Sequence, residues 1–359
     1  MNWLDFRVQK RLNLNPEKIE AIYAMISEID GVKNSWTITE NLLPQTLERL
    51  TRSVIVTSTG ASNRIEGNRL TDLEVENLYK NLRVKKFKTR DEQEIVGYLE
   101  CLELIFNRYQ DIPVSESTIL QLHSDMLSHS DKDVRHKGNY KFGSNRVEAK
   151  DQSGRIVGVI FDPTPPYLVK KEMQELFDWY DWAVETKVKH PLILIANFIF
   201  EYLAIHPFQD GNGRTSRLLT NLMLLQQGYL FDMVVSHERI IEANKVDYYL
   251  ALNKTQATWK HDHEDITPWL MFFLSVIKSQ SDQALKILAG DKIEYLLSEK
   301  QLELWQWINE SGSEFTRKDA IEALGFPART VESIIKKLVD LKRIEPLGQG
   351  KATRYRLMK

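Results

Sequence analysis

Two apolar segments, residues 192–205 and 218–225, flank a polar stretch of twelve residues, and this arrangement constrains the chain more than any other feature. Both segments are rich in large apolar residues, so each is predicted to form a helix buried in a core. Glu201 is the one charged residue of the first segment. The polar stretch must then form a loop and the first turn of the second helix, which places its chemistry at a helix N-terminus.

The polar stretch reads His206-Pro-Phe-Gln-Asp-Gly-Asn-Gly-Arg-Thr-Ser-Arg217. Gly211 and Gly213 flank Asn212 and let the backbone take positive φ angles, so that consecutive N–H groups can point into one concavity. Such a concavity binds anions, and the positive end of the following helix dipole adds to the attraction. The stretch therefore predicts a phosphate-binding loop.

Charged side chains around the glycines complete a predicted polyphosphate site. Arg214 and Arg217 are three residues apart, on one helix face, and offer planar donors to phosphate oxygens. Asp210 is placed to hold Mg²⁺, since this cation usually takes one or two protein carboxylates plus phosphate and water oxygens. His206 is the natural general base for a hydroxyl that attacks phosphorus. Each fragment alone is typical of an ordinary turn or a solvated helix, whereas their order and spacing favour the site.

The stretch resembles the signature of the Fic family, His-x-Phe-x-(Asp/Glu)-Gly-Asn-Gly-Arg-x-x-Arg, at every specified position. The resemblance implies transfer of AMP from ATP to a Ser, Thr or Tyr hydroxyl of a protein, with Mg²⁺ as cofactor. It implies that His206 takes the hydroxyl proton, that Asp210 coordinates the metal and that Phe208 anchors the loop in the core. The residues implied to bind the ATP phosphates are Gly211, Asn212, Gly213, Arg214 and Arg217.

A second match lies upstream, at residues 61–68, Ala-Ser-Asn-Arg-Ile-Glu-Gly-Asn. Ser62 and Glu66 fit the Fic inhibitory motif, (Ser/Thr)-x-x-x-Glu-(Gly/Asn). The resemblance implies that Glu66 pairs with Arg217, the arginine that would otherwise bind the γ-phosphate of ATP. The alternative is an ordinary helix that ends at Gly67, with the glycine in the left-handed conformation and the carboxylate in solvent. The presence of the signature favours the inhibitory interpretation.

Two further elements follow the family pattern. Residues 144–161 predict a β-hairpin in a mainly helical chain. In Fic proteins such a hairpin, the flap, aligns the target segment by strand addition, and the resemblance gives Val147 this docking role. A later helix, expected to begin near Glu242, contains Tyr-Tyr-Leu-Ala-Leu, which resembles the element that lines the adenine pocket. Tyr249 and Gln256 are the adenine contacts that follow, and core packing of the aromatic residues is the alternative.

The predicted fold is mainly α: a Fic-type helical core with a β-hairpin flap, followed by a C-terminal winged helix-turn-helix domain. Helical periodicity covers most of the chain up to residue 290, and Ser115 is predicted to cap a helix that starts the catalytic core. The predicted organisation is an N-terminal helical region with the inhibitory motif at 1–112, the catalytic core at 113–260, a helical linker at 261–298 and the winged helix at 299–359.

The charge balance changes near the C-terminus. Residues 313–359 contain eleven Lys and Arg against six Asp and Glu, whereas the whole chain has a net charge of −2. Three short helices and two strands about residues 348–350 give the outline of a winged helix, which resembles the C-terminal domain of some bacterial Fic proteins. The side chains available to DNA phosphates or base edges are Arg329, Thr330, Lys336 and Lys351. Docking of a protein, or of a second copy of the chain in a homodimer, is the equal alternative.

Composition excludes some classes of protein. A hydrophobic content of 42% and a charged content of 27% are ordinary for a soluble globular chain. The first residues lack the basic, apolar and cleavage regions of a secretion signal, and residues 192–205 are too short to span a membrane. A single cysteine, Cys101, excludes an internal disulfide. We therefore expect a cytoplasmic protein with no membrane segment.

Two classes of function compete for the chain. The first is a protein adenylyltransferase, which can also modify itself, held inactive by Glu66. The second is a DNA-binding regulator in which the Fic core only senses nucleotide. Intact His206 and Asp210 favour catalysis, because a sensor has no use for a base. The resemblance also leaves open an enzyme that removes AMP or uses another donor, and it does not name the target protein.

Overall fold

The computed structural model describes residues 3–358 except 37–43, 83–86, 88, 131–132, 134, 146, 151–155, 289–298, 312–313, 341–342 and 349–352. The chain divides into two compact units. The larger comprises residues 1–40 and 50–285, and the smaller comprises residues 41–49 and 286–359. The N-terminal region and the catalytic core, predicted as separate domains, share the larger unit, because α5 packs on both α6 and α9.

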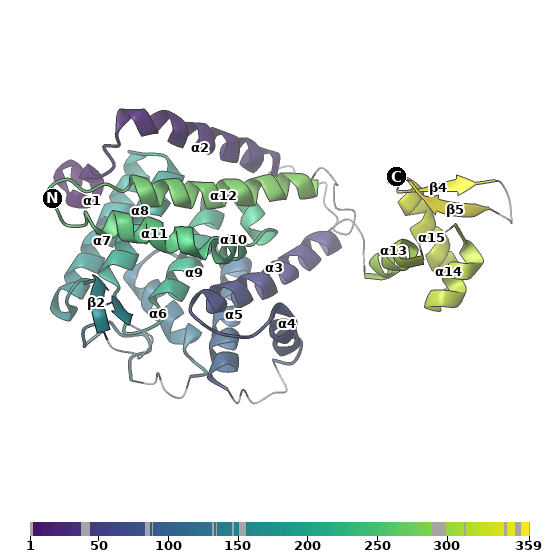
Figure 1. The fold of residues 1–359 in the computed structure, drawn as a ribbon, viewed down its shortest axis with the longest axis horizontal. Helices are drawn as coiled ribbons and strands as arrows, with labels where there is room; N and C mark the ends of the chain where they lie inside the picture. Colours follow the sequence, from purple (N-terminus) through teal and green to yellow (C-terminus); the bar gives the residue numbers. More distant parts are fainter. Residues whose placement is uncertain are drawn as a thin grey trace. The chain divides into compact units, whose positions relative to one another are not determined.

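The described part of the larger unit is built of helices and one β-hairpin. Helices α2 and α12 run along one side of this unit, and α4, α5 and α6 lie on the opposite side (Figure 1). The helices are η1 Trp3–Asp5, α1 Arg7–Lys10, α2 Pro16–Trp36, α3 Pro44–Ile65, α4 Asp72–Lys80, α5 Arg90–Arg108, α6 Glu116–Met126, α7 Pro166–Thr186, α8 Pro191–Ile205, α9 Asn212–Gln226, η3 Leu230–Met233, α10 His237–Ala243, α11 Lys245–Gln256 and α12 Thr267–Leu288.

The two helices predicted around the polar stretch are confirmed as the centre of this unit. In α8 every side chain from Leu192 to Ile205 is buried, and the helix packs between α7 and α9. Helix α9 is buried along most of its length. A helix that is apolar all round has to be enclosed by other helices, so the loop between α8 and α9 is fixed at both ends by the core.

Local capping sets several helix boundaries. The Ser115 side chain accepts a hydrogen bond from the Thr118 backbone, which confirms the predicted N-cap of α6. Capping boxes at Thr71 and Thr89 start α4 and α5. The helix predicted to begin near Glu242 is α11, and it begins three residues later, at Lys245. Asn244, whose backbone leaves the helical region (φ −117°, ψ 34°), separates it from α10.

The predicted hairpin is confirmed. Strand β1 (Val147–Lys150) pairs antiparallel with β2 (Ile156–Phe161), and Val147 lies opposite Phe161. The turn at 151–155 is outside the described residues. The docking role predicted for Val147 concerns a side chain that also lies outside the described part of the structure, and it stays a prediction.

The smaller unit contains the helices and strands predicted for it. Its three-stranded antiparallel sheet has the order β3-β5-β4, and an apolar core that includes Trp305, Phe315 and Ile334 joins the sheet to the helices. Lys351, in the predicted wing tip, lies outside the described residues. The elements are α13 Glu299–Ser311, β3 Phe315–Thr316, α14 Arg317–Leu324, α15 Ala328–Asp340, β4 Ile344–Leu347 and β5 Arg354–Leu357.

Across the part of the chain that the structure describes, none of the helices is both long and apolar enough to cross a membrane. The apolar α8 has 15 residues, which is shorter than the roughly 20 that a membrane-spanning helix needs.

Candidate active site

The loop between α8 and α9 is held by its own side chains. Asn212 Oδ1 accepts from the Phe208 backbone N–H, and Asn212 Nδ2 donates to the Phe208 carbonyl, both at 2.8 Å. Phe208 is fully buried, and its ring stacks on that of His123 with centroids 3.7 Å apart. The core anchor predicted for Phe208 is therefore present. The side chain of Asn212 holds the loop, which leaves its backbone amide as the group that can face a phosphate.

His206 ends α8 in the left-handed conformation, with φ 54° and ψ 60°. Its Nδ1 lies 3.1 Å from the Leu203 carbonyl. Since a carbonyl can only accept, Nδ1 carries the proton and Nε2 keeps a lone pair. Burial, with a contribution from the nearby Lys141 ammonium, lowers the pKa of His206 to about 4. The imidazole is therefore neutral near pH 7 and can accept a proton.

The two glycines of the loop have different roles. Gly211 has a φ of 82°, as predicted for a left-handed turn. The positive φ predicted for Gly213 is wrong, because this residue already belongs to α9. Glycine leaves room there for the Glu66 carboxylate, which would have to move if a side chain were present, since a Cβ at position 213 would lie 2.2 Å from Glu66 Oε1. Glu66, the residue after the end of α3, therefore reaches the N-terminus of α9.

Arg217 is bound by the end of α3. Its Nε donates to Ser62 Oγ (2.7 Å), and its Nη2 donates to both the Ser62 carbonyl and Glu66 Oε1 (2.8 Å each). The Arg217 side chain is 3% exposed and that of Glu66 37%. Burial alone would lower the pKa of Arg217, but the Glu66 carboxylate raises it above its usual value. The contact that the family resemblance implied between Glu66 and Arg217 is thus present.

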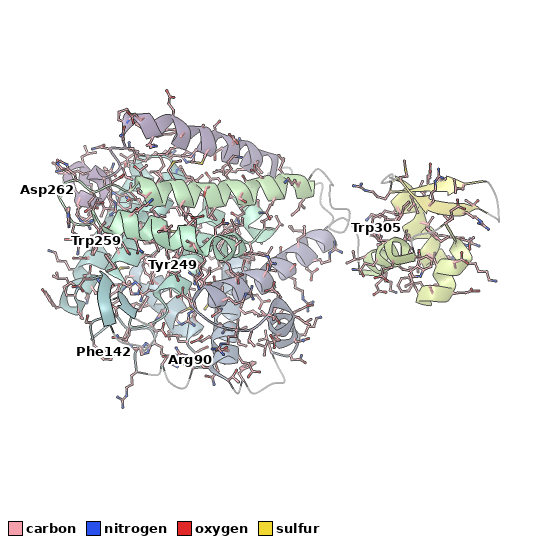
Figure 2. The ribbon with its side chains drawn as sticks, viewed as in Figure 1. Arg90, Phe142, Tyr249, Trp259, Asp262 and Trp305 are labelled. Carbon is pink, nitrogen blue, oxygen red and sulfur yellow. The ribbon has the colours of Figure 1, made fainter. Side chains whose placement is uncertain are left out.

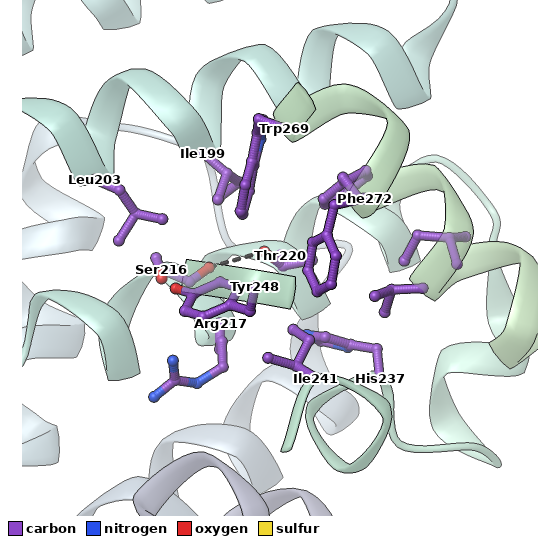
Figure 3. A pocket seen from close by; sticks show the side chains of 13 residues that line it. Ile199, Leu203, Ser216, Arg217, Thr220, His237, Ile241, Tyr248, Trp269 and Phe272 are labelled. Carbon is purple, nitrogen blue, oxygen red and sulfur yellow. Dashed lines mark hydrogen bonds between the residues drawn. The ribbon is translucent and has the colours of Figure 1, made fainter. Parts of the chain in front are cut away.

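A small apolar cavity of about 20 Å³ adjoins Arg217. Side chains from α8, α9, α10, α11 and α12 surround it, and the guanidinium of Arg217 points away from Trp269 and Phe272 (Figure 3). Apolar walls exclude water from the side of Arg217 that faces the core. Low polarity there strengthens the attraction between Arg217 and a carboxylate or phosphate at its open end.

Asp210 is contacted by two arginines. Arg90 Nη2 lies 3.0 Å from Asp210 Oδ2, and Arg214 Nη2 lies 3.5 Å from Asp210 Oδ1. Burial would raise the pKa of Asp210, but Arg214 and the Gly211 N–H lower it below its usual value, so the carboxylate is charged. Arg214 also pairs with Glu94 at 3.4 Å. Arg214 and Arg217 lie three residues apart on α9, but their guanidinium groups contact different partners: Asp210 and Glu94 for the first, Ser62 and Glu66 for the second.

The Asp210 carboxylate is compatible with a bound Mg²⁺. Its side chain is 44% exposed and lines the main cavity of the site. No cluster of three or more metal-ligating side chains occurs in the described ranges. A single carboxylate still suits Mg²⁺, which takes its remaining ligands from phosphate and water.

The main cavity has a volume of about 500 Å³ and contains most of the predicted site. His206, Asp210 and Glu66 line one part of it, and Tyr249 and Gln256 from α11 line another. Tyr249, labelled in Figure 2, is 40% exposed, whereas its neighbour Tyr248 is buried. The two residues predicted to contact adenine therefore share one cavity with the predicted base.

Residues 113–224 match the Fic/DOC family. This part of the chain is a Fic/DOC family domain. The Fic domain begins two residues before the N-cap of α6 and ends within α9, so it contains the flap hairpin β1–β2 and the whole loop described above.

Curated proteins named protein adenylyltransferase Fic are similar in sequence to this chain. The chain is 26% identical over 278 residues to the protein adenylyltransferase Fic of Nematostella vectensis, covering 76% of this chain and 58% of the relative. It is 32% identical over 167 residues to the protein adenylyltransferase Fic of Drosophila willistoni, covering 46% of this chain and 31% of the relative. The chain therefore spans less than two thirds of the length of these relatives.

Solved structures agree in fold. A Fic family protein from Desulfovibrio desulfuricans G20 is 25% identical, covers 96% of this chain and 97% of its own, and superposes with a TM-score of 0.64. Fic-1 from C. elegans (residues 134–508) is 19% identical, with a TM-score of 0.61 and coverage of 79% of this chain and 77% of its own. The second likeness shows the fold alone.

The structure adds residues that sequence reasoning missed. His123 Nδ1 accepts from the Gly138 N–H (2.9 Å), so Nε2 carries the proton and donates to the Asp210 carbonyl (3.0 Å). Arg90 contacts the predicted metal ligand from α5. Lys141 and Asn145 bind backbone carbonyl groups at the end of α8 and the start of the loop that follows it. No local pattern marks these residues, because they reach the site from 60 or more positions away in the chain.

Proposed function

We propose that the protein is an adenylyltransferase that moves AMP from ATP to a Ser, Thr or Tyr hydroxyl of a protein. The observation that carries this is the placement of His206 Nε2, with its lone pair, in the same cavity as the N-terminus of α9. A base beside an anion-binding helix end serves attack of a hydroxyl on phosphorus. The names of the curated relatives support the same reaction.

The proposed reaction is a displacement at the α-phosphorus of ATP. The acceptor oxygen forms a bond to the α-phosphorus while its proton moves to His206 Nε2. The bond between this phosphorus and the bridging oxygen to the β-phosphate breaks, and pyrophosphate leaves. The backbone amides at the start of α9 are placed to bind the phosphate oxygens as negative charge shifts onto the leaving group. Tyr249 and Gln256 are the groups available to adenine.

We propose that Asp210 holds Mg²⁺ when ATP is bound. The ion would neutralise phosphate charge, which is the chemistry such a cation supplies. For this carboxylate to bind metal, Arg90 must release it, since the two groups are now in contact. Arg90 and Asp210 are both about half exposed, so this ion pair is easily exchanged.

We also propose that Glu66 inhibits transfer. Its carboxylate occupies Arg217 and the space in front of Gly213, where the outer phosphates of ATP would bind. A bound triphosphate would meet a like charge there and lose its arginine partner. The protein would therefore transfer AMP slowly until Glu66 moves.

Labelled ATP tests the reaction. The protein is incubated with Mg²⁺ and either α-labelled or γ-labelled ATP, and its intact mass is then measured, together with that of added protein targets. Retention of the α-label with the mass of AMP supports the proposal. Retention of the γ-label identifies a phosphotransferase instead, and loss of AMP from a previously modified protein identifies the reverse reaction.

A second candidate function concerns the smaller unit. Helix α15 buries Val331, Ile334 and Leu338, so its opposite face presents Arg329 and Lys336 to solvent. This placement fits a helix that meets DNA phosphates. Binding of duplex DNA by the full chain should weaken steeply as salt rises, and Lys336→Ala should weaken it for all sequences. Absence of duplex binding at low salt, together with self-association that requires α15, would favour a homodimer or docking module.

A further inference from the structure

Lys141 binds the end of α8 and the loop that follows it. Its backbone N–H donates to the Pro207 carbonyl at 2.8 Å. Its Nζ donates to the Ile205 carbonyl at 3.2 Å and to Asn145 Oδ1 at 2.7 Å. The residue is 3% exposed, so its ammonium group is held among these acceptors and not in water. Lys141 therefore supplies a buried cation at the C-terminus of the helix that precedes the catalytic loop.

Asn145 binds the two carbonyl groups of this segment that Lys141 does not contact. Its Nδ2 donates to the carbonyls of His206 (3.1 Å) and Phe208 (2.7 Å). Together with Lys141, it provides a donor for each of the four consecutive carbonyl groups of residues 205–208. We call this set of contacts from Lys141 and Asn145 the loop clamp.

The loop clamp meets a physical need of the chain at this point. The last carbonyls of a helix have no partner within the helix and carry partial negative charge. A cation and amide donors at the end of α8 satisfy these groups. In addition, His206 has a left-handed backbone, which costs roughly 1–2 kcal/mol for a residue with a side chain. Contacts on both sides of His206 are needed to hold it in that conformation.

We propose that Lys141 and Asn145 are positioning residues for the transfer reaction: the loop clamp fixes the backbone of residues 205–208 and so aims His206 at the reacting hydroxyl. This inference rests on the proposed function. The loop clamp also joins the base to the flap hairpin, because β1 begins at Val147, two residues after Asn145.

The charge of Lys141 supports the same role. Burial is the largest cause that lowers the pKa of His206, and the nearby Lys141 ammonium lowers this pKa further. Burial lowers the pKa of Lys141 itself to about 8, still above neutral pH, so the group is mostly charged when His206 is neutral. The loop clamp thus orients the base, and its cation adds to the larger effect of burial in favouring the neutral imidazole.

Asn145→Asp tests the loop clamp with almost no change of shape. The carboxylate keeps an acceptor for Lys141, but it loses the N–H donors to the His206 and Phe208 carbonyls. Asn145→Ala removes both kinds of contact. Asn139→Asp is the matched control, since Asn139 is an exposed neighbour whose Nδ2 donates to the Lys137 carbonyl. All three are made in the Glu66→Gly background, which removes the proposed inhibition.

We expect Asn145→Asp to lower kcat for AMP transfer about 10- to 100-fold, because small misplacement of a catalytic group has effects of this size. The KM for ATP should change by less than about threefold, or about 0.6 kcal/mol, and Asn139→Asp should match its parent. Lys141→Arg, which keeps the charge, should retain more activity than Lys141→Met. Unchanged kcat in Asn145→Asp overturns the proposal. An equal loss of ATP affinity and thermal stability also overturns it, because that pattern indicates a general structural role.

A measurement without activity separates this proposal from the proposed function. If the Glu66→Gly parent transfers no label, the adenylyltransferase assignment fails, but the loop clamp can still be examined by amide hydrogen exchange. The amides of His206 and Phe208 should exchange at least about tenfold faster in Asn145→Asp than in Asn139→Asp, a difference of about 1.4 kcal/mol in opening. Equal exchange in the two variants overturns the loop clamp itself.

Discussion

The carboxylate of Glu66 lies in the space that a side chain at position 213 would need: a Cβ atom on Gly213 would lie 2.2 Å from Glu66 Oε1. The same oxygen accepts from Arg217 Nη2 at 2.8 Å. One carboxylate oxygen therefore contacts the first turn of α9 and its second arginine together. Since helix N-termini attract anions, Glu66 occupies the position that a phosphate group would take.

His206 is the base of the proposed reaction, and His206→Ala should abolish AMP transfer. The binding of ATP and the thermal stability should remain close to the parent values, because the side chain lies at the loop and not within α8. Transfer is measured with α-labelled ATP, and binding is measured by calorimetry. His261→Ala, an exposed loop histidine, is the control. A variant that keeps more than about a tenth of the parental rate, a change of under about 1.4 kcal/mol, would remove His206 from the role of base.

The pKa of His206 sets the acid limit of the reaction. Because burial lowers this pKa to about 4, the imidazole stays neutral and able to accept a proton well below pH 6. The rate of transfer should therefore be steady from neutral pH down to about pH 5 and fall as the pH passes through about 4. The same lowered pKa makes the folded protein lose stability as the pH falls from the usual histidine pKa toward 4, since the unfolded chain binds the proton more readily. Single-turnover rates across this range provide the test, and an inflection near pH 6.5 contradicts it.

If Asp210 holds Mg²⁺ as proposed, Arg90 competes with the metal for this carboxylate, so Arg90→Ala should lower the Mg²⁺ concentration needed for half-maximal transfer. An exposed ion pair is worth about 0–1 kcal/mol, which limits the shift to about fivefold. Arg108→Ala removes an exposed ion pair with Asp111 at the other end of α5 and is the matched control. Asp210→Ala should lose activity together with its dependence on Mg²⁺. Activity of the parent that persists in excess chelator would count against the metal proposal.

Much of the larger unit could be predicted because its signals are local. The apolar residues of α8, the N-cap at Ser115 and the turn-rich segment of the hairpin are all signals between residues close in the chain. The loop 206–211 is also local, so its left-handed Gly211 and buried Phe208 follow from the motif. The break at Asn244 was not predicted, because the residues on both sides of it continue a helical pattern.

The residues that were missed act across the fold. Glu201 interrupts an apolar segment for no reason visible in the sequence. In the structure it pairs with Arg7 of α1 and with Arg11, the residue that follows this helix. Glu264, in the loop between α11 and α12, binds the same two arginines. Pairings over such distances leave no periodic pattern, and only the packed helices bring them together.

The buried pair of Arg11 and Glu201 predicts a large effect on stability. Both side chains are almost fully buried, and their atoms lie 2.5 Å apart. Arg11→Ala should destabilise the protein by about 3–5 kcal/mol, because it leaves part of a buried charge without a partner. The double change Arg11→Met with Glu201→Leu should cost much less than Arg11→Ala, since it removes both charges and fills the space. Urea unfolding followed by tryptophan fluorescence measures both, and equal losses would contradict this account.

Glu66→Gly tests the proposed inhibition most directly. The change frees Arg217 for the outer phosphates of ATP and removes a like charge from the front of Gly213. A charge-assisted hydrogen bond contributes about 1.5–3 kcal/mol, and about 1.4 kcal/mol is a factor of ten. Transfer of the α-label should therefore rise on the order of 10- to 100-fold. Glu76→Gly, an exposed glutamate in an ion pair on α4, is the control for loss of a surface charge.

The double variant Glu66→Gly with Arg217→Ala decides whether the gain arises from the released arginine. If Arg217 binds ATP once Glu66 is gone, the double variant should lose most of the increase. If Glu66 acts mainly by filling the space at the start of α9, the double variant should keep the increased rate of transfer, because that space stays open in it. Transfer and ATP affinity that are unchanged in Glu66→Gly itself would show that Ser62 and Glu66 merely join α3 to α9. The paired rates and ATP dissociation constants thus separate charge release, steric release and a purely structural contact.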